Sequence, residues 1–433
     1  MKNLDHSPDP NGSRLVVKNE KSFPYYGYFV VLFSFIIMVI LWGIFHSFGV
    51  YFKPMISEFG WTRALTSGAF SLAAILSGVV AAFMGWLNDK FGSRVVMSLC
   101  GLFLGLGCIF MSQTESLWDF YVYYGIILGL AMGGGFIPLI STVTRWFAAD
   151  RGLMTGIVAS GVGFGALVGP QISNRLLLHF GWRGSYLITG ITALVAVVAA
   201  AQFLKNHSDH RDQRADDSLQ PMSKPADTDH QSVSLRQALG SAQFWIFSLT
   251  GFCYGYSLFS LTVHVVPHAV DLGIMPKMAA GLLSTFGGLS IVGKIFFGKI
   301  LDRIKGKKTM FIGFTMMAFA FLILVFSERT WTIFMSAGVF GFFYGACTVS
   351  HAPITAILFG LKSHGLILGV MGISVTIGGA LGPFLAGAIY DQTESYRTAF
   401  AICAVMGVIG MIGTSALRQK RIQLQARTVK PTL

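Results

Sequence analysis

Long apolar runs alternate with short polar stretches along almost the whole chain. The runs are centred near residues 38, 75, 103, 129, 162, 193, 254, 288, 317, 342, 375 and 406. An α-helix needs about 20 apolar residues to cross the hydrocarbon core of a bilayer. Strands of a membrane barrel alternate apolar and polar residues at every second position, and these runs do not. The pattern predicts an all-α membrane protein with twelve transmembrane helices.

One stretch interrupts this pattern and divides the chain into two parts. Residues 205–233 are polar and charged, with almost no large apolar side chains. Such a composition is typical of a linker that cannot build a packed core. Just after it, Ser234 is the expected N-cap of a short amphipathic helical segment. The predicted organisation is a cytoplasmic tail (1–24), a six-helix half (25–204), a cytoplasmic linker (205–240), a second six-helix half (241–417) and a cytoplasmic tail (418–433).

The second part of the chain repeats the first at a constant offset of 213 residues. The offset brings Pro267 onto Pro54 and Gly298 onto Gly85 without gaps between them. Further matched pairs are Gly273 with Gly60, Asp302 with Asp89, Lys307 with Arg94, and Gly382 with Gly169. Two six-helix halves related by a parallel repeat predict a substrate site between them, near the middle of the membrane.

Charge is scarce, and its positions indicate a membrane rather than nucleic acid. The 433 residues carry a net charge of +13, but only 12% of them are charged. Lys and Arg gather in alternate connections, which predicts that both termini are cytoplasmic. The polar first 24 residues give no sign of a cleavable signal peptide. The five cysteines lie in apolar runs without metal or redox spacing, and no nucleotide loop or catalytic triad is present. We therefore expect that the protein binds no cofactor and no metal, and that it is not an enzyme.

Lys294 is the most unusual charge, because it lies inside the apolar run Met278–Asp302. A cation at that depth costs roughly 2.5–3.5 kcal/mol, so it requires a partner, a watery cavity or a route to the surface. One interpretation is a snorkelling side chain, since the expected helix end is only about 12 Å away at 1.5 Å per residue. The other is an anchor for a substrate carboxylate, supported by Ser284, Thr285 and Ser290 on the same run.

Other polar groups in the apolar runs complete the candidate site. Tyrosine and histidine side chains offer a polar tip on a ring, which suits a small organic acid with an apolar carbon end. The predicted substrate-binding residues are Lys294, Tyr344, His46, Tyr254, Ser290 and Tyr124. Because histidine titrates near neutral pH, His46 and His264 are candidates for proton coupling. Ordinary packing and interhelical hydrogen bonding remain the alternative for each of these residues.

The connection at Gly85–Arg94 reads GxxxDKxGxR, and a degraded copy occupies Gly298–Lys307. This motif resembles the cytoplasmic loop signature of the major facilitator superfamily. The stretches Ser47–Leu72 and RWFAADRGLMTG further resemble bacterial members of the monocarboxylate transporter and oxalate/formate antiporter group. In that group a cation on the eighth span, usually Arg, binds the substrate carboxylate, and Lys294 occupies that place.

This chain departs from the family pattern at three places. Lys replaces Arg, and an ammonium cannot form a planar fork with a carboxylate. Animal monocarboxylate transporters have an Asp one turn before the cation, where this chain has Ser290, and a Lys on the first span, where it has His46. The oxalate antiporter has a second lysine on span eleven, whereas Gly369–Gly387 carries no charge. The last difference disfavours a dianion as substrate.

Charged residues in the two signature loops are expected to latch the halves together in the outward-open state. They are Asp89, Arg94, Asp302 and Arg303. Charge pairs and helix ends supply the attraction. A role in topology alone is the alternative.

These observations predict a secondary active transporter in a cell membrane, the inner membrane if the source is bacterial. The expected cargo is a small monocarboxylate of the lactate or pyruvate class, moved with a proton by alternating access. One alternative is an organic anion antiporter. A proton-driven drug exporter usually needs a carboxylate in the membrane, and none is found. A membrane receptor or membrane-bound enzyme fits the 6+6 repeat poorly.

Overall fold

The computed structural model describes residues 24–147, 151–205, 233–304, 306–360 and 364–418, and these are almost entirely helical. The first part contains α1 (Pro24–His46), α2 (Phe48–Phe59), α3 (Arg63–Phe91), α4 (Ser93–Met111), α5 (Leu117–Phe120), the π-helix η1 (Tyr121–Leu128), α6 (Gly129–Gly133), α7 (Ile137–Trp146) and α8 (Arg151–Gln202). The second part contains α9 (Leu235–Leu239), α10 (Ala242–Asp271), α11 (Pro276–Ile304), α12 (Gly306–Phe326), α13 (Thr330–Phe359), α14 (His364–Thr393) and α15 (Arg397–Ala416).

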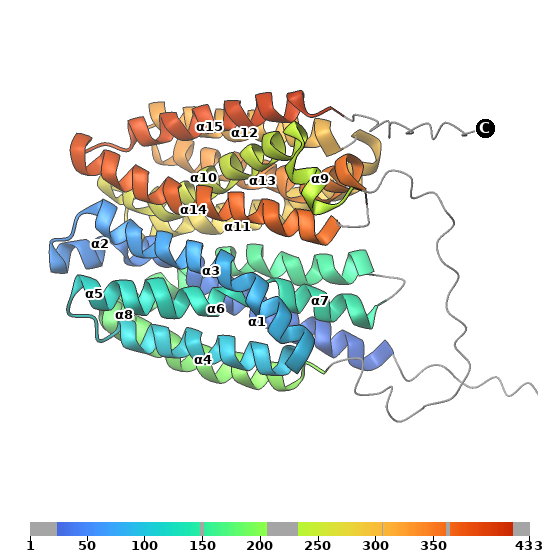
Figure 1. Cartoon of the computed structure of the whole chain (residues 1–433). Helices are drawn as coiled ribbons and strands as arrows, with labels where there is room; N and C mark the ends of the chain where they lie inside the picture. The colour runs from blue at the N-terminus through green and yellow to red at the C-terminus, as the bar shows by residue number, and fades with distance from the viewer. Residues whose placement is uncertain (1–23, 148–150, 206–232, 305, 361–363, 419–433) are drawn as a thin grey trace, which may run out of the picture.

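The helices form two bundles that lie side by side (Figure 1). In the first half, α8 packs on α1 and α4; in the second, α10 packs on α14 and α11 packs on α13. The two halves meet mainly where α3 contacts α14, α8 contacts α11, and α2 contacts α10. We call the end of the bundle where α2 ends and α3 begins the distal end. The proximal end is where α1 begins and α15 ends.

The predicted membrane spans are confirmed. Eleven helical segments of the described residues are long and apolar enough to cross a bilayer. One of them, α8, contains two spans, because Gly181 has φ 68° and ψ 176° and interrupts the helix between the runs centred near 162 and 193. Glycine adopts this conformation without the steric cost that a Cβ brings. The result is the twelve-helix, two-half architecture that the pattern predicts.

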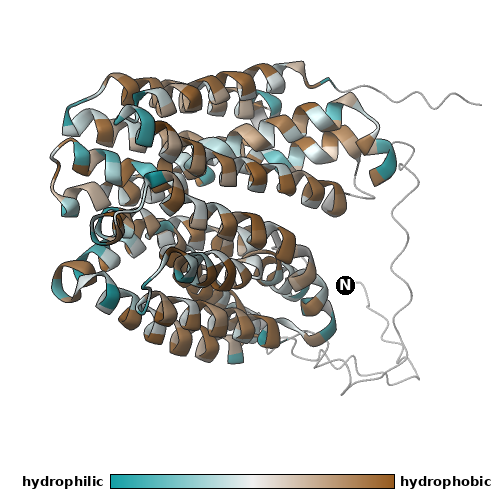
Figure 2. Ribbon diagram, turned by 60° about the vertical axis from the view of Figure 1, so that its left-hand side comes forward, coloured by the Kyte–Doolittle hydropathy of each residue, from teal (hydrophilic) through white to brown (hydrophobic). Residues whose placement is uncertain are grey.

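The surface of the bundle is apolar along the lengths of the helices. Figure 2 shows most of the strongly hydrophilic positions near helix ends. Large side chains such as Phe326, Trp118 and Val79 are well exposed. Exposed apolar area on this scale is typical of a lipid-facing surface.

The fourth span is broken, which the apolar pattern does not reveal. It starts as α5, winds into the π-helix η1 and α6, and stops before α7 begins at Ile137. Three consecutive glycines, Gly133 to Gly135, precede the break, and Pro138 lies in the first turn of α7. Glycine weakens a helix interior, and proline is well accommodated in a first turn, where its missing N–H costs no helical hydrogen bond. The first span differs too, since α2 prolongs it to Phe59 beyond a turn at Ser47.

Glycines allow several of the closest helix contacts. A Cβ at Gly169 would overlap the backbone of Gly43, which brings α8 against α1. The repeat-related position in the second half, Gly382, lies equally close to the Tyr256 carbonyl of α10. These residues are scaffold and leave the site to other side chains.

The predicted cap at Ser234 is confirmed. Its hydroxyl accepts from the Gln237 amide at 3.4 Å, and the Gln237 side chain accepts from the Ser234 amide at 2.9 Å. The resulting helix, α9, is separate from α10, which has its own cap at Ser241. Nearly all of the predicted linker and of both predicted tails lies outside the described residues.

Candidate substrate-binding site

Lys294 lies on α11 with its ammonium against an aromatic face. Its Nζ atom is 5.2 Å from the centre of the Tyr344 ring on α13, and the side chain is partly exposed. An ammonium over a ring face is attracted by the ring quadrupole. Within the described part of the chain, Nζ makes no hydrogen bond and no ion pair. Among the described residues, the Tyr344 ring positions this cation and no anionic side chain neutralises it.

The Tyr344 ring belongs to an aromatic group that joins three helices. Tyr254 of α10 stacks on it at 5.3 Å with an interplanar angle of 9°. The Tyr254 hydroxyl shares a hydrogen bond of 2.8 Å with the Thr348 hydroxyl. On the other side, Phe286 of α11 lies 5.5 Å from the Tyr344 ring. The ring under the ammonium is thus packed against aromatic side chains of two neighbouring helices.

His46 of α1 brings the first half to the same place. Its ring is buried, 6.1 Å from Phe286 and 5.7 Å from Trp42. It is close enough to Lys294 to interact with it electrostatically. The indole nitrogen of Trp42 is buried without a hydrogen-bond partner in the described residues. We call Trp42, His46, Tyr254, Phe286, Lys294 and Tyr344 the central cluster.

A cavity of about 220 Å³ adjoins the central cluster through Trp42. It lies between the halves, because Phe259 and Thr376 of the second half line it together with first-half residues. The other lining residues are Phe45, Ala74, Ser77, Gly78, Ala81, Met132, Gly133, Phe136 and Ile137. An apolar cavity beside a fixed cation can hold the carbon part of an organic acid whose carboxylate meets the ammonium.

Two predicted site residues have their contacts elsewhere. The Ser290 hydroxyl donates to the Gly287 carbonyl at 2.8 Å, on the side of α11 that faces Gly163 of α8. Tyr124 is buried in the first half, with its ring 4.7 Å from Phe48. Its hydroxyl has no partner among the described residues. The structure thus brings together Lys294, Tyr344, Tyr254 and His46, without a described contact from Tyr124.

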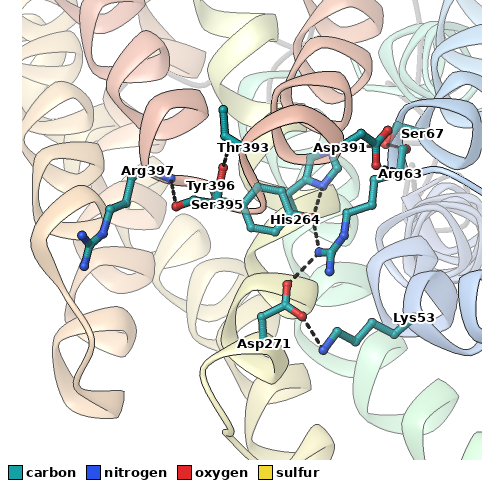
Figure 3. A network of polar contacts seen from close by, with 10 residues as sticks. All are labelled: Lys53, Arg63, Ser67, His264, Asp271, Asp391, Thr393, Ser395, Tyr396 and Arg397. Atoms are coloured by element: carbon teal, nitrogen blue, oxygen red, sulfur yellow. Dashed lines mark hydrogen bonds and ion pairs between the residues drawn. The ribbon is translucent and has the colours of Figure 1, made fainter.

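A second polar cluster closes the distal end between the two halves (Figure 3). Lys53 and Arg63 of the first half both pair with Asp271 of α10, at 2.5 and 2.8 Å. The guanidinium of Arg63 also donates to the Tyr396 hydroxyl at 2.6 Å. The backbone amides of Arg63 and Ala64 each donate to the Asp391 carboxylate of α14 at 2.8 Å. We call Lys53, Arg63, Ser67, His264, Asp271, Asp391 and Tyr396 the distal network.

His264 belongs to the distal network rather than to the central cluster. Its Nε2 lies 2.8 Å from the Pro383 carbonyl, and its Nδ1 lies 3.0 Å from the Tyr396 hydroxyl. The Ser67 hydroxyl of α3 is 3.4 Å from Nε2. Tyr254 is ten residues away on α10, about 15 Å at 1.5 Å per residue. Burial raises the pKa of the Tyr396 hydroxyl, so this phenol stays protonated.

The sequence interpretation did not assign a role to the charges of the distal network. Lys53, Arg63 and Asp271 lie at the ends of apolar runs, where charges ordinarily set topology. The repeat contains a signal, because Asp271 falls on Glu58 at the offset of 213. Glu58, however, pairs with Arg183 of its own half. The repeat therefore identifies an acidic position but not the half to which it binds.

The predicted latch remains a prediction. Arg94 donates to the Gln202 carbonyl at 2.8 Å, within its own half. The side chains of Asp89, Asp302 and Arg303 lie outside the part of the structure that is described.

A bilayer-length helical bundle in two repeated halves, with a cation-bearing site between them, defines a membrane transporter. The chain belongs to the Major Facilitator Superfamily, whose family model matches residues 27–306 and 265–428. The resemblance expected from the signature loops is thereby confirmed. The two matches together span nearly the whole described chain.

Among curated proteins, the chain is similar to several monocarboxylate transporters. It is 24% identical to human monocarboxylate transporter 7 over 459 residues, which cover 92% of this chain and 87% of that protein. It is 26% identical to rat monocarboxylate transporter 13, covering 89% of this chain and 87% of that protein. For rat monocarboxylate transporter 12 the identity is 27%, with coverage of 88% and 82%.

Among solved structures, the chain resembles a bacterial homologue of the human lysosomal transporter Spinster in an inward-facing and occupied conformation. The TM-score is 0.72 over 90% of this chain and 96% of that one. The sequence identity is 14%, so the likeness concerns the fold alone.

Proposed function

We propose that this protein is a secondary active transporter for a small monocarboxylate of the lactate or pyruvate class, moved together with a proton. The observation that carries the proposal is the Lys294 ammonium, which lies between the halves without an anionic partner among the described residues. One cation fits one carboxylate, and in a low-dielectric passage the pair is far stronger than in water. The similarity to monocarboxylate transporters supports the same class of cargo.

In this proposal, each end of the cargo has a place in or beside the central cluster. The carboxylate meets Nζ of Lys294 beside the Tyr344 ring. The Tyr254 ring stacks on the Tyr344 ring, and its hydroxyl would hydrogen-bond to a hydroxyl or keto oxygen of the cargo. The carbon end extends past His46 and Trp42 toward the apolar cavity. His46 and His264 stay the proton-coupling candidates of this proposal.

Alternating access follows from where the halves touch. The distal network and the bond from Ser284 to the Leu167 carbonyl, at 2.6 Å, join the halves. Toward the proximal end, no hydrogen bond or ion pair among the described residues joins the halves. We infer a carrier closed distally and open proximally. The charge pattern supports a cytoplasmic proximal side, and the proposed location is a bacterial inner membrane. The predicted latch of Asp89, Arg94, Asp302 and Arg303 would close the proximal side in the opposite state.

Uptake into proteoliposomes tests the proposal. Labelled lactate, pyruvate, oxalate and a lipophilic cation are offered with and without an inward pH gradient. We expect lactate or pyruvate to enter, with stimulation by the gradient, and oxalate and the lipophilic cation to stay out. Uptake that requires an organic anion inside the vesicles indicates an antiporter instead. Entry of the lipophilic cation alone refutes the assigned cargo.

A further inference from the structure

A third histidine, His351 of α13, adjoins the central cluster on the side away from His46. Its ring lies 5.1 Å from the Tyr254 ring and stacks on Phe247 at 5.7 Å. Tyr254 in turn stacks on Tyr344, the ring over which the Lys294 ammonium lies. Two stacked tyrosine rings therefore separate His351 from Lys294.

The hydrogen bonding of His351 fixes its tautomer. Its Nδ1 lies 2.7 Å from the backbone carbonyl of Cys347, which accepts hydrogen bonds but cannot donate. The neutral ring must therefore carry its proton on Nδ1, and Nε2 presents a bare lone pair. That Nε2 atom is buried and has no hydrogen-bond partner in the described residues. A buried, oriented and unused acceptor requires an explanation.

Three other histidines of the described residues are buried, and they are less suited to accept a proton with the cargo. His268 also has an unpartnered Nε2, but its ring packs on Tyr396 and Phe400 at the distal end, away from the central cluster. Both ring nitrogens of His264 already have partners in the distal network. His46 interacts electrostatically with Lys294, so a proton on His46 is opposed by that ammonium at close range. His351 has the free nitrogen and the greater separation from the cation.

We propose that His351 is the proton-binding residue that couples proton movement to cargo binding at Lys294. The inference rests on the proposed function, because it assumes that a carboxylate binds at Lys294. The titratable groups facing His351 are Tyr254 on α10 and Cys347 on its own helix, with Lys294 of α11 beyond Tyr344. None of these groups is acidic, and Lys294 is the cation among them.

The coupling follows from electrostatics between the two sites. In the empty carrier the ammonium opposes a second positive charge at His351. A carboxylate bound at Lys294 cancels that charge, so a proton from water can add to Nε2, forming an N–H bond and an imidazolium. By linkage, the proton strengthens cargo binding by the same factor that cargo strengthens proton binding. With two rings between the two charges and an intermediate effective dielectric constant, this coupling factor is of the order of tenfold. Cargo release restores the repulsion and expels the proton.

The test uses the full chain in proteoliposomes and the variant His351→Asn. An Asn amide can still donate to the Cys347 carbonyl, but it cannot take up a proton. Lactate and pyruvate are the probes, measured in two assays. One is accumulation driven by an inward pH gradient, with proton entry followed by a pH dye inside the vesicles; the other is counterflow at equal pH. The matched control is His179→Asn, an exposed histidine outside both clusters.

We expect His351→Asn to lose the pH-driven accumulation and the proton entry, while its counterflow stays within about twofold of the unmodified chain. The control keeps both activities. Accumulation that persists in His351→Asn overturns the inference and leaves the proposed function standing. Equal loss of counterflow and accumulation also overturns it, because the residue then serves cargo movement in general. If the unmodified chain takes up neither acid under any condition, the inference and the proposed function both fail.

Discussion

At the scale of single residues, the position of Lys294 bears on the two interpretations of its charge. A snorkelling lysine directs its ammonium to the helix end and to solvent. Here the ammonium lies over the ring of Tyr344, a residue in the middle of α13. Tyr254 stacks on that ring. This geometry favours an anchor for an anion, since the aromatic faces position the charge without satisfying it.

Replacement of Lys294 by alanine is expected to abolish uptake of lactate and pyruvate. The carboxylate would then enter a low-dielectric passage without a counterion, which is strongly unfavourable. Initial rates in proteoliposomes with matched protein content provide the measurement. Lys299→Ala is the control, because Lys299 is an exposed residue of the same helix. Normal uptake by Lys294→Ala would remove the basis for the assigned cargo.

The Tyr344 ring provides a second prediction at this scale. Tyr344→Leu removes the cation–π contact, which is worth about 0.5–2 kcal/mol, so the KM for cargo should rise by roughly two- to thirtyfold. Tyr344→Phe keeps the ring and should stay within a few-fold of the unmodified chain. Kinetics over a range of lactate concentrations separate the two variants. Equal effects of both would show that the hydroxyl matters and the ring does not.

At the scale of helices, the apolar pattern predicted the spans but not their interruptions. Hydropathy reports which segments can lie in lipid, and all twelve runs are present as helix. It does not report local backbone geometry, so the break before α7 and the π-turns of η1 were not predicted. The three glycines ahead of Pro138 were the available signal for the break.

Close helix contacts at glycine give a prediction at the same scale. A Cβ at Gly165 would lie 2.6 Å from the backbone nitrogen of Gly43, so Gly165→Val should force α8 away from α1. Overpacking of this kind costs about 1–3 kcal/mol. Thermal denaturation of the purified protein in detergent should occur several degrees lower. Gly156→Ala is the control, since a Cβ at this position would meet no described atom within 4 Å beyond its own stretch of helix. An unchanged denaturation temperature for Gly165→Val would contradict the packing argument.

At the scale of the whole molecule, the repeat is symmetric in sequence and asymmetric in its ion pairs. Glu58 binds Arg183 within the first half, whereas Asp271, at the equivalent position, crosses to Lys53 and Arg63. A periodicity argument cannot find such a difference, because the partners are more than 200 residues apart and belong to different halves. The central cluster was more accessible to prediction, since a lysine inside an apolar run is conspicuous without any knowledge of its neighbours.

Neutralising Asp271 is expected to loosen the distal end. Asp271→Asn removes the shared carboxylate from two cations, and hydrogen bonds to charged groups are worth about 1.5–3 kcal/mol each. The population of distally open molecules should rise roughly ten- to hundredfold. Spin labels at Gln113→Cys and Gln392→Cys, exposed distal positions on opposite halves, should then report a longer distance.

The matched control for this experiment is Glu58→Gln, which occupies the repeat-related position but pairs inside one half. Its distance distribution should resemble that of the unmodified chain. The five native cysteines are all buried, which favours labelling of the introduced ones. A distribution in Asp271→Asn that matches the control would show that the distal network does not hold the halves together.

The carboxylate of Asp391 completes the first turn of α3, although the two belong to opposite halves. Free amides at a helix start must find a partner or remain solvated. Each time the halves part on this side, the Arg63 and Ala64 amides lose their acceptor and meet bulk water. Deuterium uptake by those two backbone amides therefore reports how often the halves part on this side, in a protein that carries no added label.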